Sequence, residues 1–246
     1  MPRAAPSRAI PIVALDVATT DAALALVRRL GDRCRFYKVG SELFTAEGPS
    51  IVRAIREEGA DVFLDLKFHD IPNTVAGAVR SATGLGVRLL TVHASGGSAM
   101  LAAAQRAAEE SGEATGVLAV TVLTSLDAVN LAEAWGRDGE LGVGSEVERL
   151  AGLAAAAGVH GIVCSGAEVS DVRSRFGDRL APLVPGIRLA GRATHDQRRV
   201  MTPAAAQAAG ARYLVLGRAV TAEPDPAEAM SRVLAELRDA PRDVGA

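Results

Sequence analysis

The sequence has few aromatic residues and no strong charge imbalance. Aromatic side chains make up only 3% of the 246 residues, whereas hydrophobic residues make up 49%, so we expect aliphatic side chains to fill the core. The net charge of −2 argues against a broad nucleic-acid interface, which requires a basic face. A local cationic pocket for one phosphate group remains compatible with this balance.

Cysteines and long hydrophobic runs are also scarce. Cys34 and Cys164 are the only cysteines, and they lack metal-ligand spacing, so we expect two buried, reduced thiols. The apolar run 10–17 is too short for a signal sequence and contains Asp16. No stretch approaches the ~18 apolar residues of a membrane-spanning helix. We therefore expect a cytoplasmic protein without membrane association.

Short apolar segments alternate with stretches of helical spacing along the chain. The apolar segments are Ile10–Val17, Arg35–Val39, Asp61–Leu66, Val87–His93, Gly116–Leu123, Gly161–Cys164, Leu183–Ile187 and Tyr213–Leu216. The helical stretches include Asp21–Leu30, Pro49–Glu58, Thr74–Thr83, Ala99–Glu110, Ser145–Ala157 and Thr202–Ala209. Near-continuous apolar strands that alternate with helices are typical of a parallel sheet covered by helices.

The number of these units selects the fold. Eight strand-and-helix units in about 250 residues predict an α/β protein with a single (β/α)8 TIM barrel, because open doubly wound sheets typically have about five or six strands. We expect one domain over residues 1–246, with a core at about 10–238 and frayed ends at 1–7 and 241–246. Glycines that follow helical stretches and precede strands support these boundaries. They are Gly59, Gly86, Gly158 and Gly210.

Charged residues end the first three predicted strands. Asp16 ends the first and Lys38 the second, and the third carries Asp65 and Lys67. Side chains two apart on a strand share a face, so Lys38, Asp65 and Lys67 can meet at the barrel mouth. Asp70 follows in the loop and completes an alternating Lys–Asp–Lys–Asp set. Desolvating such charges is costly unless they pair, so the set is either a catalytic centre or an inert ion-pair network.

A phosphate site is predicted after the last two strands. Gly217 and Arg218 form a tight turn that opens a short helix, where backbone N–H groups and a guanidinium suit a phosphate dianion. The seventh strand runs into Pro185 and Arg188, and the polar loop that follows contains Gln197 and is long enough to act as a lid. Barrels frequently bind phosphate between these two loops. The alternative is a solvated arginine in a surface turn.

Other catalytic motifs are missing from the sequence. It has no zinc-ligand spacing, no Ser–His–Asp constellation and no Walker-type or G-x-G-x-x-G motif at a strand-to-helix turn. We therefore predict no metal and no cofactor. His93 ends the fourth strand, and it either lines the pocket or is a partly buried imidazole with internal partners.

The segment Asp65–Thr74, DLKFHDIPNT, closely resembles the signature of the orotidine 5′-phosphate decarboxylase family, in its bacterial form. This signature is long and more specific than a bare D-x-K. Further motifs follow in the order of the family: LDV at Asp16, YKVG at Lys38, TVHASGG from Thr91, VTVLTS ending at Ser125, VPGIR at 184–188, DQRRVMTP at 196–203 and LGRAVT at 216–221. The likeness covers nearly the whole chain.

The resemblance implies a cofactor-free decarboxylation of orotidine 5′-monophosphate to uridine 5′-monophosphate. Lys67 resembles the lysine that delivers a proton to C6, with Asp65 beside the scissile carboxylate and Lys38 holding Asp65 and the ribose. The implied substrate-binding residues are Asp16 and Lys38 at the ribose, Thr124 and Ser125 at the pyrimidine, and Arg188, Gln197, Gly217 and Arg218 at the phosphate, together with Pro185. Asp70, a fourth catalytic residue, reaches with Ile71 and Thr74 into the site of a neighbouring subunit in this family, so a homodimer is implied.

Two alternatives stay open. The first is a metal-dependent barrel with the same D-x-K-x-x-D motif that acts on sugar phosphates as a decarboxylase or aldolase. It requires acidic Mg²⁺ ligands at neighbouring strand ends, whereas here Lys38 ends the second strand and Glu42 is the nearest acidic candidate. The second is a non-catalytic phosphate-binding barrel, which gains nothing from Asp65 facing an anion. Sensitivity to a chelator marks the first, and binding without turnover marks the second.

Overall fold

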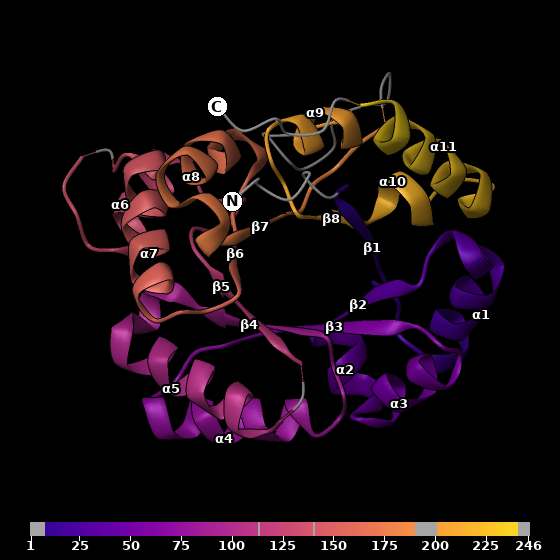
Figure 1. The fold of residues 1–246 in the computed structure, drawn as a ribbon, viewed down its shortest axis with the longest axis horizontal. Helices are drawn as coiled ribbons and strands as arrows, with labels where there is room; N and C mark the ends of the chain where they lie inside the picture. Colours follow the sequence, from indigo (N-terminus) through magenta and orange to yellow (C-terminus); the bar gives the residue numbers. More distant parts are fainter. Residues whose placement is uncertain (1–7, 113, 140, 190–200, 241–246) are drawn as a thin grey trace, which may run out of the picture.

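The fold, seen in a computed structural model, is a closed barrel of eight parallel strands (Figure 1). The structure describes residues 8–112, 114–139, 141–189 and 201–240, so the ends expected to fray lie outside the described residues. Each strand pairs with the next, and β8 pairs with β1. The strands are β1 (Ile10–Ala14), β2 (Phe36–Gly40), β3 (Asp61–Phe68), β4 (Leu89–His93), β5 (Gly116–Val120), β6 (Gly161–Val163), β7 (Ala181–Val184) and β8 (Tyr213–Leu216). The predicted (β/α)8 TIM barrel is confirmed.

Helices surround the barrel as an outer layer (Figure 1). They are α1 (Thr20–Leu30), α2 (Ser41–Glu47), α3 (Ser50–Glu57), α4 (Pro72–Thr83), α5 (Gly97–Glu110), α6 (Ala128–Ala134), α7 (Val143–Ala156), α8 (Val169–Phe176), α9 (Pro203–Ala208), α10 (Arg218–Thr221) and α11 (Pro226–Asp239). Side-chain caps fix several of their starts. Thr19, Asp127 and Asp225 accept hydrogen bonds from the first N–H groups of α1, α6 and α11.

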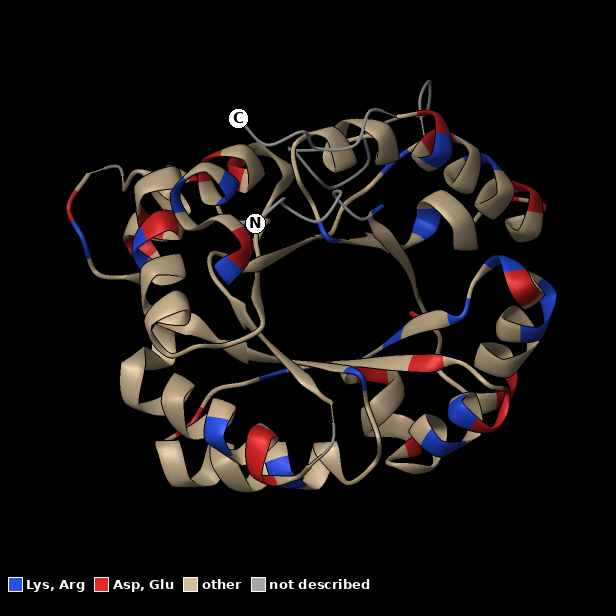
Figure 2. Cartoon of the chain, in the orientation of Figure 1, with Lys and Arg blue, Asp and Glu red and all other residues tan. Residues whose placement is uncertain are grey.

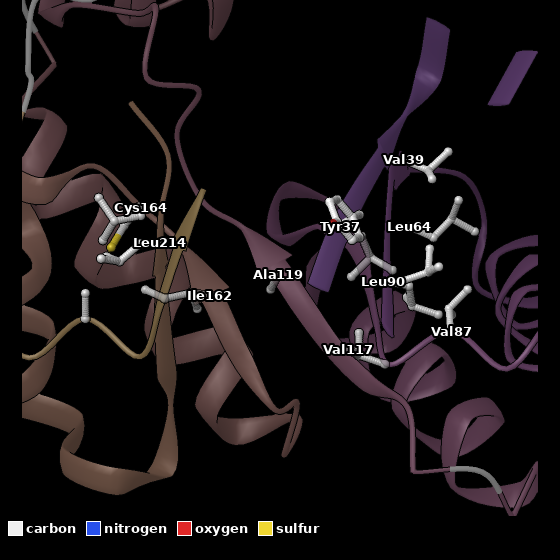
Figure 3. Packing of buried hydrophobic residues seen from close by; sticks show 14 of the residues in the cluster. Tyr37, Val39, Leu64, Val87, Leu90, Val117, Ala119, Ile162, Cys164 and Leu214 are labelled. Atoms are coloured by element: carbon white, nitrogen blue, oxygen red, sulfur yellow. The ribbon is translucent and has the colours of Figure 1, made fainter. Parts of the chain in front are cut away.

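The hydrophobic core has two layers because successive strand residues point to opposite faces. Ile12 and Ala14 point into the barrel, whereas Val13 and Leu15 belong to the larger cluster between strands and helices. Figure 3 shows part of that larger cluster, which is mostly aliphatic, as predicted. The barrel interior differs, since three of the few aromatic residues pack there. They are Phe36, Phe63 and Tyr213.

Several predicted boundaries shift at strand ends. The seventh strand was expected over Leu183–Ile187, but β7 is Ala181–Val184. Pro185 has no backbone N–H to continue the ladder, and Gly186 has a φ of 77°, so pairing stops there. Ile187 keeps a single isolated bridge to Met201. The four glycines predicted at helix ends all have positive φ, between 71° and 99°.

The structure also shows the state of the two thiols and the apolar length of the helices. Cys34 and Cys164 are both buried free thiols, as expected. Among the described residues, no helix is long and apolar enough to cross a membrane.

Candidate active site

Four charged side chains alternate in sign at the carboxyl ends of β1, β2 and β3. Lys38 Nζ lies 2.9 Å from Asp16 Oδ1 and 3.9 Å from Asp65 Oδ2. Lys67 Nζ lies 2.8 Å and 2.9 Å from the two Asp65 oxygens. We call Asp16, Lys38, Asp65 and Lys67 the charged ring. Figure 2 shows that most charged residues lie on the helices and loops, so charges on inner strands are exceptional.

The charged ring is unevenly buried. The side chains of Lys38 and Asp65 are only 12% and 14% exposed, whereas those of Lys67 and Asp16 are 37% and 63% exposed. Buried charges persist only when they are paired, and Asp65 has a lysine on each side. Lys67 is therefore held by Asp65 and is still accessible to a ligand. In an inert ion-pair network, by contrast, every charge is paired and none is accessible to a ligand.

The third strand is irregular where it carries the two central residues. The pairing of β3 with β4 shifts between Leu64 and Phe68, and Lys67 has a φ of 51°. A non-glycine residue in this region is uncommon and often marks a functional site. Thr91 of β4 bonds to both residues: it donates to Asp65 Oδ1 at 2.9 Å and accepts from the Lys67 N–H at 2.9 Å. The sequence reasoning did not identify Thr91 as a site residue.

A cavity of about 160 Å³ opens beside the charged ring. Its charged wall consists of Lys38, Asp65 and Lys67. The remaining wall is largely apolar and comes from β3, β5, β6, β7, β8 and the segments that follow β5 and β7: Phe63, Val120, Val122, Leu123, Thr124, Val163, Leu183, Pro185 and Val215. Thr124 and Pro185 therefore line the same cavity as the three charged residues. Ser125 is exposed and is not one of the lining residues. The cavity suits a small, partly apolar group that presents an anion to the lysines.

Residues predicted to hold the phosphate follow β7 and β8, which are neighbours in the barrel. Arg188 is half-buried, and its backbone N–H donates to the Met201 carbonyl at 2.9 Å. Arg218 is exposed and begins α10, directly after Gly217. A Cβ atom added to Gly217 would lie 4.0 Å from Asp16 Oδ2, so this turn adjoins the charged ring. Gln197 lies outside the described residues.

Asp70, Ile71 and Thr74 do not join the charged ring of their own chain. All three are exposed, and Ile71 is 68% exposed. Asp70 Oδ1 accepts a hydrogen bond from the Ile71 N–H at 2.6 Å, and within the described residues Asp70 pairs with neither lysine. The fourth member of the ring in this chain is Asp16, whereas the sequence had suggested Asp70.

His93 lies at the end of β4, half-buried, with its ring centroid 5.5 Å from that of His69. Burial lowers the pKa of His93, and the nearby His69 and Lys67 lower it further. Neutral His93 is therefore favoured beside the cationic lysine. Among the described residues, no group of three or more His, Cys, Asp and Glu side chains is arranged to hold a metal ion.

Comparison with known proteins gives a consistent result. Residues 10–233 match the profile of the "Orotidine 5′-phosphate decarboxylase / HUMPS family". The chain is 50% identical over 227 residues to the orotidine 5′-phosphate decarboxylase of Halorhodospira halophila, covering 92% of this chain and 94% of that protein. It is 49% identical over 231 residues to the enzyme of the same name from Moorella thermoacetica, covering 92% and 91%.

Solved structures give the same answer. The crystal structure of orotidine 5′-phosphate decarboxylase from Lactobacillus acidophilus superposes with a TM-score of 0.82 at 34% sequence identity. The match covers 94% of this chain and 99% of that one.

Proposed function

This chain belongs to the orotidine 5′-phosphate decarboxylase / HUMPS family, and from that premise we propose that its charged ring decarboxylates orotidine 5′-phosphate. The reaction yields uridine 5′-phosphate and carbon dioxide, a step of pyrimidine biosynthesis. The observation that carries the proposal is the Lys67–Asp65 pair, which lies on the wall of a largely apolar cavity. We also propose that the enzyme works in the cytoplasm.

The reaction leaves charge on one carbon atom, and Lys67 is the residue we assign to it. The bond between C6 and the carboxylate breaks, its electron pair stays on C6, and carbon dioxide departs as a neutral molecule. C6 has no adjacent group that delocalises this pair well, so a cation fixed nearby must stabilise it. The Lys67 ammonium then gives a proton to C6 and regains one from solvent. No metal or other cofactor is needed in this scheme.

Asp65 and Lys38 set up this chemistry in our proposal. Asp65 holds the Lys67 ammonium through both carboxylate oxygens. In the complex Asp65 also faces the substrate carboxylate, and that repulsion ends when neutral carbon dioxide leaves. Lys38 lies between Asp16 and Asp65, so it fixes the position of Asp65 and, with Asp16, meets the ribose hydroxyls.

The distant phosphate supplies binding energy that the small pyrimidine cannot. Arg188, Gly217, Arg218 and Gln197 hold the phosphate in our proposal, and Thr124, Ser125 and Pro185 border the pyrimidine. Binding energy from a remote group can be used to organise the reacting groups, so this grip contributes to turnover as well as to affinity. Enzymes lower barriers by roughly 8–23 kcal/mol, which is more than one lysine supplies.

We further propose that the active unit is a homodimer with shared sites. Asp70, Ile71 and Thr74 are exposed in the single chain, and Asp70 is not paired with the lysines of its own chain. In the proposed dimer each chain supplies these residues to the site of the other, where Asp70 approaches Lys67.

The alternative of a metal-dependent sugar-phosphate enzyme fits this site less well. Both oxygens of Asp65 are within hydrogen-bonding distance of Lys67, and Asp16 is paired with Lys38, so both acidic residues are already neutralised by lysines. Glu42 lies on α2 beyond the end of β2 and is exposed. A non-catalytic phosphate binder fits less well still, because Asp65 facing the ligand opposes anion binding.

The test is the ultraviolet absorbance of orotidine 5′-phosphate mixed with purified protein, with and without EDTA. Loss of the orotate band at the same rate in both samples is the expected result. An EDTA-sensitive loss assigns a metal to the reaction and overturns the cofactor-free scheme. An unchanged spectrum with folded protein overturns the function itself, and bound but unconverted nucleotide then identifies a binding protein.

A further inference from the structure

We propose that Thr91 is a positioning residue that aligns Asp65 and Lys67 for the reaction. This inference rests on the proposed function and adds a residue to its machinery. Thr91 is fully buried on β4 and is not one of the residues that line the cavity, so it has no direct route to the substrate. Its hydroxyl nevertheless bonds to the two central members of the charged ring.

The irregular pairing of β3 with β4 explains why a hydroxyl is required here. The strands are in register at Leu64 with Leu90 and again at Phe68 with Val92, so residues 65–67 lie opposite Thr91 alone. The main chain of β4 cannot pair with every group of this longer stretch. The Thr91 hydroxyl accepts the Lys67 N–H at 2.9 Å in place of a strand carbonyl.

The same hydroxyl also fixes the carboxylate that holds the ammonium. Having accepted from the Lys67 N–H, it donates its own hydrogen to Asp65 Oδ1 at 2.9 Å. Asp65 in turn accepts from Lys67 Nζ at 2.8 Å. Thr91 therefore contacts Lys67 in two ways. Its hydroxyl bonds directly to the backbone N–H of Lys67, and it reaches the Lys67 ammonium indirectly, through Asp65. A closed set of hydrogen bonds of this kind restrains both ends of the side chain.

The backbone of Lys67 makes this restraint necessary. Its φ of 51° is in the left-handed region, which a residue other than glycine keeps only when its surroundings hold it there. Without the Thr91 hydroxyl the Lys67 N–H has no partner from β4, and the segment can relax towards an ordinary strand. Such relaxation turns the Lys67 side chain away from Asp65 and from C6.

This role makes a specific kinetic prediction. A misplacement of about 1 Å can cost about 100-fold in rate, so Thr91→Val should lower kcat by roughly 10- to 100-fold. KM should change by less than about threefold, because Thr91 is not in the cavity wall and the lost interaction acts on the transition state. Thr91→Ser keeps the hydroxyl and should restore kcat to within about threefold of the wild type.

Two controls separate positioning from a purely structural role. Thr83→Val removes an equally buried hydroxyl that donates to the Arg80 carbonyl within α4, and it should leave kcat unchanged. The second control is a reaction that needs no decarboxylation: exchange of the C6 hydrogen of uridine 5′-phosphate in D₂O, followed by proton NMR. Lys67 catalyses this exchange in the proposed scheme, so Thr91→Val should slow it as well.

The experiment measures kcat, KM, C6 exchange and thermal unfolding for the wild type and these three variants. A lower kcat with little change in KM for Thr91→Val, restored in Thr91→Ser, supports the proposal. Equal kcat in Thr91→Val and the wild type overturns it, and so does a Thr91→Ser variant as slow as Thr91→Val. If Thr91→Val does not fold, Thr91→Ala is measured in its place, because it removes the same two hydrogen bonds with a smaller side chain. The same outcomes for kcat and KM then support or overturn the proposal. A wild type that does not convert orotidine 5′-phosphate refutes the proposed function instead.

Discussion

At the scale of single residues, Lys67 joins an unusual backbone to the proposed chemistry. Its φ of 51° lies at the irregular part of β3, and its ammonium meets both oxygens of Asp65. Residues held in such conformations cluster at functional sites, because local strain persists only where the surroundings over-determine it. The strain and the ion pair therefore point to the same residue as the reacting group.

Replacing Lys67 tests this assignment directly. Lys67→Ala should lower kcat for orotidine 5′-phosphate by about 10⁴-fold or more, because it removes both the proton donor and the nearest stabilising charge. Circular dichroism and binding of uridine 5′-phosphate should show that the variant still folds and still holds nucleotide. Turnover close to that of the wild type would rule out the role of Lys67.

His93 makes the stability of the protein depend on pH. Burial, His69 and Lys67 lower its pKa in the folded chain, whereas the unfolded chain has the ordinary value of about 6.5. As the pH falls below about 6.5, the unfolded state takes up the proton first, so the free energy of unfolding decreases. The contribution of His93 is thus fully present at neutral pH and is lost on acidification.

The measurement is urea unfolding of the wild type and of His93→Gln at pH 7.5 and at pH 5.5. The wild type should lose more of its unfolding free energy between the two pH values than the variant does. An equal loss in both proteins contradicts the proposed contribution of His93.

Some of the residue-level picture was predictable, and some of it was not. The sequence placed Lys38, Asp65 and Lys67 together because parallel strands end at one edge. The prediction assumed that Asp65 and Lys67 share a face of a regular strand, whereas β3 is irregular between Leu64 and Phe68. That irregularity depends on how β3 pairs with β4, and the pattern of residues within one strand does not indicate it. Thr91 was not predicted as a site residue for the same reason.

At the scale of elements, the pattern of apolar runs correctly predicted the number of strands and their parallel arrangement. It did so because each strand is an apolar run bounded by turn residues. Boundaries were less predictable where one residue ends the pairing, as Pro185 does after β7. The helix α8, like α2, α6 and α11, had no counterpart among the helical stretches named from the sequence. Its eight residues carry several polar side chains and only three buried positions, so its apolar periodicity is weak.

The turn between β8 and α10 is predicted to act on the phosphate alone. Arg218→Ala should lower kcat/KM for orotidine 5′-phosphate by about 10- to 100-fold, because it removes a charge-assisted hydrogen bond to the phosphate. Orotidine, which lacks the phosphate, is the matched control, and the two proteins should convert it equally slowly. Equal kcat/KM on the phosphorylated substrate contradicts the phosphate assignment.

Strand β6 shows how closely the barrel is packed. A Cβ atom on Gly161 would lie 2.1 Å from the Ala181 carbonyl oxygen of β7, and backbone cannot move aside cheaply. Gly161→Ala should therefore lower the free energy of unfolding by about 1–3 kcal/mol.

Gly152 is the matched control for this substitution. A Cβ atom there meets nothing within 4 Å, and the residue lies inside α7, so Gly152→Ala should stabilise by about 0.5–1 kcal/mol. Urea unfolding of both variants gives the comparison. A Gly161→Ala protein as stable as the wild type contradicts the predicted clash.

At the scale of the whole molecule, the charged ring of one chain lacks the acid that the family resemblance assigns to it. Asp70 is exposed and bonds to the Ile71 N–H, and the 68% exposure of Ile71 leaves an apolar side chain in water beside it. The proposed twofold dimer accounts for both features, since an isologous interface gives each chain the same residues of its partner. Asp70 and Lys67 of one chain then serve different sites.

This arrangement predicts recovery of activity from two inactive proteins. Lys67→Ala and Asp70→Asn should each be inactive as homodimers. In a mixed dimer one site carries both substitutions, and the other carries intact Lys67 from one chain and intact Asp70 from its partner. Random exchange makes half of the dimers mixed, and each of these has one active site of two, so turnover should reach about a quarter of the wild-type value. Co-expression of the two chains with different affinity tags isolates the mixed dimers, and these purified dimers should turn over at about half the wild-type value. Mixed dimers without activity mean that each chain supplies both residues to its own site, whereas failure to recover any mixed species means that the chain does not dimerise.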